Sequence, residues 1–141
     1  MRFLTLLTAL FFIVSCGESG GDENLTPVDT SGYEKTSSGL QYKIIKEGDG
    51  KAPTLNNEVE IHYEGKLLNG KVFDSSFKRG TTASFPLNKL VKGWQEGLPL
   101  IKEGGEILLL VPPQLGYGDQ QAGIIPPNST LYFRIKLFKV K

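Results

Sequence analysis

The single tryptophan of this 141-residue chain lies in the segment Val91-Lys92-Gly93-Trp94-Gln95-Glu96-Gly97-Leu98. Apolar residues at positions 90, 91, 94 and 98 recur at helical spacing, and Pro99 lacks the amide for a further helical hydrogen bond. The pattern therefore predicts a helix over 91–98. Isolated helices shorter than about 12 to 15 residues are marginal in water, and each interior glycine weakens this one by about 1 kcal/mol relative to alanine. The rest of the chain must pack around it.

From position 40 onward, apolar and polar residues alternate, which is typical of half-buried strands. The alternation predicts strands at 40–44, 58–68, 71–77 and 131–140, and the apolar run 106–111 predicts a central strand. Asn69-Gly70 indicates a tight hairpin between the second and third of these strands. We therefore expect an α+β fold in which an antiparallel sheet of five to six strands wraps around one short helix.

Composition excludes several classes of function. The formal net charge is +1, so no basic surface predicts binding to nucleic acid. One cysteine, Cys16, and one histidine, His62, are too few for a disulfide framework, a Cys/His zinc site or a histidine-activated nucleophile. His62 falls on the polar side of its strand, and we interpret it as an exposed residue. We expect no cofactor and no metal.

The N-terminal residues predict export and anchoring. Arg2 precedes an apolar run, 3–14, that suits a signal peptide and is too short to span a membrane. The run ends in Ser15-Cys16-Gly17, which resembles a bacterial lipobox, with an ordinary cleaved signal peptide as the alternative. We expect a signal peptide at 1–15, a lipidated Cys16 with a flexible polar tether to residue 38, and one domain at 39–141. Such a protein would be lipid-anchored in the cell envelope, at the outer membrane or the periplasmic face.

A long irregular segment, 112–128, separates the last two predicted strands. Loops of this length are uncommon in compact domains unless they are functional or disordered. Since the segment carries apolar side chains that need a place to pack, we interpret it as a flap over a cavity with an aromatic floor. Spacing alone leaves open whether the aromatic residues form core or cavity; the candidates are Tyr63, Phe73, Phe85, Trp94, Tyr117 and Phe133.

A carboxylate accompanies these aromatic residues. Asp74 directly follows Phe73, and a carboxylate beside an apolar site is costly unless it is paired. Arg79 is the partner that we expect. The second oxygen of Asp74 is then available to Tyr63 or to a ligand.

Five motifs occur in order along the chain: Val59-Glu60-Ile61-His62-Tyr63-Glu64-Gly65, Val72-Phe73-Asp74-Ser75-Ser76, Val91-Lys92-Gly93-Trp94, Gly116-Tyr117-Gly118 and Ile124-Ile125-Pro126-Pro127-Asn128-Ser129-Thr130. Together they resemble the FKBP-type peptidyl-prolyl cis-trans isomerases, in particular the Mip-like bacterial branch, over 39–141. The family fold, an antiparallel sheet around a short helix, agrees with the pattern above.

The resemblance implies roles for individual residues. It implies catalytic residues Tyr63, Phe73, Asp74, Tyr117 and Phe133, with the Tyr117 hydroxyl donating to a substrate carbonyl and Arg79 as structural support. It also implies a substrate-binding set that comprises Phe85, Leu90, Val91, Trp94 and Ile125. Ala83 stands where many relatives carry an aromatic residue, and 119–123 is slightly short, so the preference for the residue before proline is expected to differ.

The implied function is acceleration of Xaa-Pro rotation in folding envelope proteins, by desolvating and twisting the amide in the aromatic pocket. No nucleophile is needed, because only a rotational barrier of about 18 to 20 kcal/mol must be lowered. The alternative is a chaperone or adhesin module that binds proline-containing segments without turnover. The expected partners are proline-containing polypeptides, macrolide inhibitors of the family and a lipid membrane through Cys16. We expect no binding to nucleic acid, and we expect a monomer.

Overall fold

The computed structural model describes residues 24–141. The seven strands are antiparallel neighbours, with the order β1-β2-β6-β7-β3-β4 and with β5 also paired to β3. They are β1 (Glu34–Lys35), β2 (Gln41–Lys46), β3 (Glu58–Leu67), β4 (Val72–Ser75), β5 (Ala83–Pro86), β6 (Glu106–Val111) and β7 (Leu131–Val140). The α-helices are α1 (Ser76–Arg79) and α2 (Lys92–Gly97), and short 3-10 turns cover Leu87–Lys89, Leu98–Leu100 and Pro113–Leu115.

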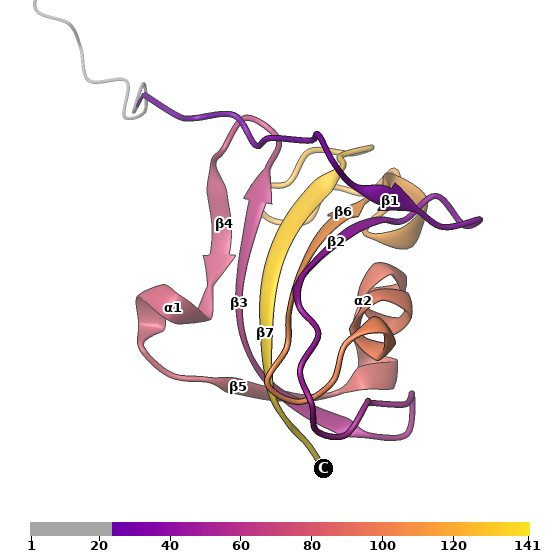
Figure 1. Cartoon of the computed structure of the whole chain (residues 1–141). Helices are drawn as coiled ribbons and strands as arrows, with labels where there is room; N and C mark the ends of the chain where they lie inside the picture. The colour runs from indigo at the N-terminus through magenta and orange to yellow at the C-terminus, as the bar shows by residue number, and fades with distance from the viewer. Residues whose placement is uncertain (1–23) are drawn as a thin grey trace, which may run out of the picture.

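The sheet curves around α2, so that one face encloses the helix (Figure 1). Alternation places every second side chain of β3 and β7 on this inner face, where Ile61 and Ile135 are fully buried. On β6, Ile107, Leu109 and Val111 are fully buried in the same core. Trp94 and Leu98 join this core from the helical side. The predicted α+β architecture is confirmed, with seven strands in place of five to six.

Helix α2 approaches the sheet closely because glycines face it. A Cβ added at Gly93 would lie 2.7 Å from a γ carbon of Val111, and one added at Gly97 would lie 2.7 Å from a δ carbon of Leu109. The two glycines that weaken the isolated helix thus allow it to pack on β6. The helix is shorter than predicted by one residue at each end, with Val91 as its N-terminal cap. At the C-terminal end, residues Leu98–Leu100 form a 3-10 turn, in which the amide that Pro99 lacks is not needed.

The region after β4 differs from the prediction. A strand was expected over 71–77, but β4 ends at Ser75, whose side chain caps α1 by accepting from the Lys78 amide. Gly80 ends this helix with φ of 75°. The four-residue strand β5, which pairs with β3, follows and was not predicted. Both elements are too short to show a period in the sequence.

The segment expected to be a flexible tether lies partly against the sheet. Within it, β1 pairs with β2, and the Val28 amide donates to the Leu68 carbonyl at 2.9 Å. Backbone hydrogen bonds to a free sheet edge need no apolar side chains, so composition does not reveal them. The packed part of the chain therefore begins before Gly39. The signal peptide at 1–15 and the lipidated Cys16 lie outside the described residues, and in 24–141 no helix combines the length and hydropathy of a membrane span.

Candidate active site

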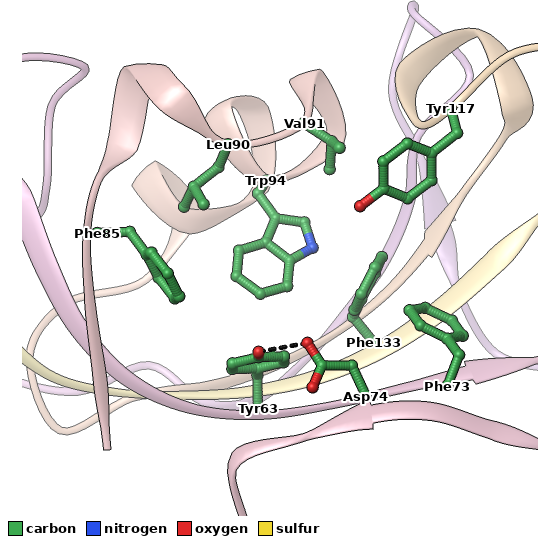
Figure 2. A pocket seen from close by; sticks show the side chains of 9 residues that line it. All are labelled: Tyr63, Phe73, Asp74, Phe85, Leu90, Val91, Trp94, Tyr117 and Phe133. Atoms are coloured by element: carbon green, nitrogen blue, oxygen red, sulfur yellow. Dashed lines mark hydrogen bonds between the residues drawn. The ribbon is translucent and has the colours of Figure 1, made fainter. Parts of the chain in front are cut away.

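A cavity of about 190 Å³ opens between α2 and the curved sheet. Its lining is aromatic and aliphatic except for one carboxylate (Figure 2). The lining residues are Tyr63, Phe73, Asp74, Phe85, Leu90, Val91, Trp94, Tyr117 and Phe133. The sequence left open whether the aromatic residues belong to core or cavity, and the structure places all six of them around this cavity. The site therefore combines residues from β3, β4, β5, α2, β7 and the segment after β6.

Trp94 forms the floor of the cavity and is only 4% exposed. Its indole meets Tyr63 edge to face at 5.3 Å between ring centroids, and Phe133 at 4.9 Å with planes 89° apart. Phe73 packs at right angles on Phe133 in turn, at 5.6 Å. Such perpendicular pairs match the positive edge of one ring to the negative face of the next. The rings therefore hold one another in place around a mostly apolar space.

The one carboxylate of the cavity is paired on both oxygens. Arg79 donates to Oδ1 of Asp74 at 2.6 Å, and the Tyr63 hydroxyl donates to Oδ2 at 2.5 Å. Arg79 also donates to the Tyr63 hydroxyl oxygen at 2.9 Å, which closes a three-membered network. The expected Asp74–Arg79 pair is thus present, and Tyr63, rather than a ligand, occupies the second oxygen.

The network determines the protonation states of its members. Partial burial alone would raise the pKa of Asp74, but the hydrogen bonds from Tyr63 and Arg79 outweigh it and leave this pKa below its ordinary value. Burial, together with the bond to Asp74, raises the pKa of Tyr63. At neutral pH, Asp74 is therefore a carboxylate and Tyr63 keeps its proton.

Tyr117 reaches the cavity from the predicted flap. Its ring extends over the pocket with the hydroxyl directed inward (Figure 2), while 44% of the residue remains exposed. Backbone bonds shape the flap: the Gly118 amide donates to the Pro113 carbonyl at 2.8 Å, and the Asn128 amide donates to the Gly118 carbonyl at 2.8 Å. The Tyr117 side chain is thus anchored by its backbone while its hydroxyl stays available to a ligand.

Ile125, which was expected in the substrate-binding set, is 5% exposed and packs in the hydrophobic core. It is not among the nine residues that line the cavity, and its role in binding stays a prediction. Its backbone exchanges hydrogen bonds with Ala122, a local bridge that turns its side chain inward. Ala83, which stands where many relatives carry an aromatic residue, pairs with Ile61 in the sheet and is partly buried against the core.

The family model described as FKBP-type peptidyl-prolyl cis-trans isomerase matches residues 49–138. The chain belongs to this family. It is 52% identical over 111 residues to the peptidyl-prolyl cis-trans isomerase Mip of Coxiella burnetii, with 78% of this chain and 48% of the relative covered. It is 46% identical over 110 residues to FkpA of Escherichia coli, with 78% of this chain and 41% of the relative covered. The chain thus spans less than half the length of these two FKBP-type relatives.

Solved FKBP-type structures share the fold. The crystal structure of FkpA from Escherichia coli superposes with a TM-score of 0.76 at 45% identity, covering 79% of this chain and 52% of that one. The crystal structure of AtFKBP13 superposes with a TM-score of 0.73 at 35% identity, covering 78% of this chain and 99% of that one. The family fold expected from the motifs is therefore confirmed.

Two residues behind this FKBP-type site were not predicted to serve it. Ser76 is fully buried and contacts the backbone of Tyr63. His62, expected to be exposed, is half-buried, and its ring stacks on Phe77 with centroids 4.7 Å apart. The prediction failed because strand alternation shows only that His62 leaves the core face, and not that α1 covers it there. In 24–141, no three His, Cys, Asp or Glu side chains gather as a metal site.

Proposed function

We propose that this FKBP-type chain is a peptidyl-prolyl cis-trans isomerase that acts on Xaa-Pro bonds. The observation that carries the proposal is the aromatic cavity over Trp94, whose single carboxylate is fully paired. Such a cavity accepts the ring of proline and offers no nucleophile, so it suits a reaction in which no covalent bond changes. Amide resonance sets the barrier to rotation at about 18 to 20 kcal/mol, while the two Xaa-Pro isomers differ by about 1 kcal/mol or less.

The dry cavity lowers this barrier by treating the planar and the twisted amide differently. A planar amide is polar because its nitrogen lone pair is delocalised onto oxygen, and twisting removes this delocalisation. An apolar environment therefore disfavours the planar ground states more than the twisted transition state. A millionfold acceleration would require about 8 kcal/mol in total. Because Arg79 balances the charge of Asp74 and Tyr63 donates to its second oxygen, the carboxylate does not oppose this desolvation.

Two donors would hold the flanking peptide while the bond rotates. The Tyr117 hydroxyl points into the cavity from the flap (Figure 2). The Val91 amide lies just before α2, where backbone amides have no partner within the helix. Donation to the carbonyls on either side of the proline would keep the chain ends in place, so that rotation is confined to the Xaa-Pro bond.

The proposed setting is the bacterial cell envelope, where proline isomerisation, which takes tens of seconds uncatalysed, would limit the folding of exported chains. Support comes from the sequence of the first residues, where an apolar run precedes Cys16, the proposed lipid attachment site. Proline-containing polypeptides are the proposed substrates. Macrolide inhibitors of the family are proposed to occupy the same cavity.

The proposal is tested by measuring cis-to-trans isomerisation of a series of Xaa-Pro peptides with the wild-type protein and two variants. Tyr117→Phe removes the flap hydroxyl, and we expect kcat/KM to fall about tenfold. Tyr42→Phe is the matched control, because its hydroxyl donates to Glu34 at 2.7 Å and lies outside the cavity. We expect this control to retain wild-type activity. A folded wild-type protein that accelerates no peptide would refute the proposal.

A binding module without turnover is the second candidate. It is favoured by the apolar side chains that the flap leaves in solvent, with Tyr117 44% and Ile124 50% exposed. Such a surface would bind unfolded segments beside the cavity. Suppressed aggregation of a proline-free model protein, without acceleration of any Xaa-Pro peptide, would support this candidate over the isomerase.

A further inference from the structure

The edge of β3 that faces away from β7 has a gap in its strand pairing beside Tyr63. On this edge, β5 pairs with β3 as far as Ile61, and pairing with β4 begins at Glu64. In an antiparallel strand, the amide and the carbonyl of one residue face the same neighbour. Both backbone groups of Tyr63 therefore point into the gap, toward the start of α1.

Ser76, the first residue of α1, fills this gap with a single atom. Its Oγ accepts from the Tyr63 amide at 2.7 Å and lies 3.2 Å from the Tyr63 carbonyl oxygen. The residue is fully buried, so bulk solvent does not compete for these contacts. The Ser76 hydroxyl thus takes the place of a paired strand at the residue whose side chain lines the cavity.

His62 contacts the same oxygen from the other side. Its Nδ1 lies 2.8 Å from Ser76 Oγ. The imidazole is held between two rings, stacked on Phe77 at 4.7 Å and edge-on to Phe138 at 5.6 Å. The direction of the His62–Ser76 hydrogen bond depends on which imidazole nitrogen carries the proton.

The surroundings of Ser76 favour one of the two directions. Ser76 has one hydroxyl hydrogen and two possible acceptors, His62 Nδ1 and the Tyr63 carbonyl. If the hydrogen went to Nδ1, the Tyr63 carbonyl would lose its side-chain donor, which is unfavourable for a buried oxygen. If it goes to the carbonyl, every group is satisfied, provided that Nδ1 carries a proton and donates to Oγ.

We propose that His62 and Ser76 are positioning residues of the active site: His62 donates from Nδ1 to Ser76, which in turn holds the Tyr63 backbone. The proposal rests on the proposed isomerase function for its consequence in catalysis. Helix α1 holds Tyr63 at two points, since Ser76 binds its backbone and Arg79, at the other end of α1, binds its hydroxyl. The position of Tyr63 in turn determines where the Asp74 carboxylate and one wall of the cavity lie.

The first test reads the hydrogen bonds directly and needs no activity. His62 is the only histidine, so long-range ¹H–¹⁵N correlations of the protein report a single imidazole. At about pH 8.5, where a free imidazole is neutral, we expect Nδ1 to be protonated and Nε2 bare. We also expect the Tyr63 amide proton to exchange slowly with solvent in the wild-type protein and much faster in Ser76→Ala.

The second test measures isomerisation in four variants. Ser76→Ala removes the bridging hydroxyl, and we expect kcat/KM to fall about 10- to 100-fold, as for other small displacements of catalytic groups. Ser75→Ala is the matched control, because it removes the neighbouring hydroxyl that caps α1 without touching Tyr63; we expect lower stability and unchanged activity. His62→Ala should lose activity, whereas His62→Asn, which can place an N–H near the position of Nδ1, should recover most of it.

The outcomes separate the two proposals. Wild-type protein that accelerates no peptide would refute the isomerase function, while the imidazole and amide measurements still test the hydrogen bonds. A bare Nδ1 would overturn the proposed donor chain. Folded Ser76→Ala with wild-type kcat/KM, or Ser75→Ala with an equal loss, would overturn the positioning role. If Ser76→Ala does not fold, the comparison of His62→Ala with His62→Asn decides, and equal activity of these two would count against the proposal.

Discussion

Gly93→Ala is predicted to destabilise the protein although it improves the helix. A Cβ added at this position would lie 2.7 and 2.8 Å from the two γ carbons of Val111 and 3.2 Å from its Cβ. Val111 is fully buried in β6, and β-branching limits its rotamers, so it has little room to move. At Gly97, the added Cβ would meet the δ carbons of Leu109 at 2.7 and 2.9 Å, the far end of a more flexible side chain.

The magnitude follows from two opposing contributions to the free energy of unfolding. Replacing glycine by alanine within a helix gains about 1 kcal/mol, and overpacking a core costs about 1 to 3 kcal/mol. Because Val111 cannot yield, Gly93→Ala should incur the upper end of this cost and lose about 2 kcal/mol net. Gly97→Ala should be nearly neutral, because Leu109 can change rotamer and the cost is then about equal to the gain.

Urea unfolding followed by the fluorescence of Trp94 measures both variants. A lower midpoint with an unchanged m value would report lost stability. The double variant Gly93→Ala/Val111→Ala should show a coupling energy of about 1 kcal/mol or more, because the second change removes the two clashing γ carbons. We also expect Gly93→Ala to reduce isomerisation, since Trp94 is the next residue. Gly93→Ala as stable as the wild type, or no coupling in the double variant, would refute the reasoning.

Two further predictions concern acid stability and the flap. Partial burial of Asp74 is outweighed by its bonds to Tyr63 and Arg79, which hold its pKa below the ordinary value in the folded state. The contribution of ionised Asp74 to the free energy of unfolding should therefore be present above about pH 4 and be lost as the pH falls below that value. Thermal unfolding between about pH 2.5 and 7 should accordingly show a smaller acid-dependent loss for Asp74→Asn than for the wild type, and equal losses would contradict the assignment. Asn128 has φ of 59°, so Asn128→Ala should lose about 1 kcal/mol and Asn128→Gly much less; equal midpoints in urea for the two variants would show that φ is not the cause.

Most of the candidate site is predictable from the sequence because the chemistry of single residues limits where they can lie. A carboxylate next to Phe73 needs a cation, and Arg79 provides it at 2.6 Å. The Trp94 helix is too weak to exist alone, and the sheet does enclose it (Figure 1). These predictions needed only the costs of an unpaired charge and of an isolated helix.

Other features depend on contacts between distant segments. Ile125 has the same apolar character as the lining residues, and a local backbone bridge to Ala122 directs it into the core. His62 alternates to the outer face as predicted, but α1 brings Phe77 onto its ring there. The spacing of residues along the sequence predicts neither placement, since each depends on which neighbour fills the space beside the side chain.

The sequence by itself determined the strand periods, the tryptophan helix that cannot stand alone, and the pairing of Asp74, because these follow from local hydrogen bonding, hydropathy and charge. Only the tertiary structure decided that all the aromatic candidates surround one cavity and that Ser76 completes the edge of β3 at Tyr63. The physical reason is that a cavity and a gap in strand pairing are both formed between segments. Their existence depends on how closely α1 and α2 approach the sheet, and this is set by glycines and by single buried hydroxyls rather than by any periodic pattern.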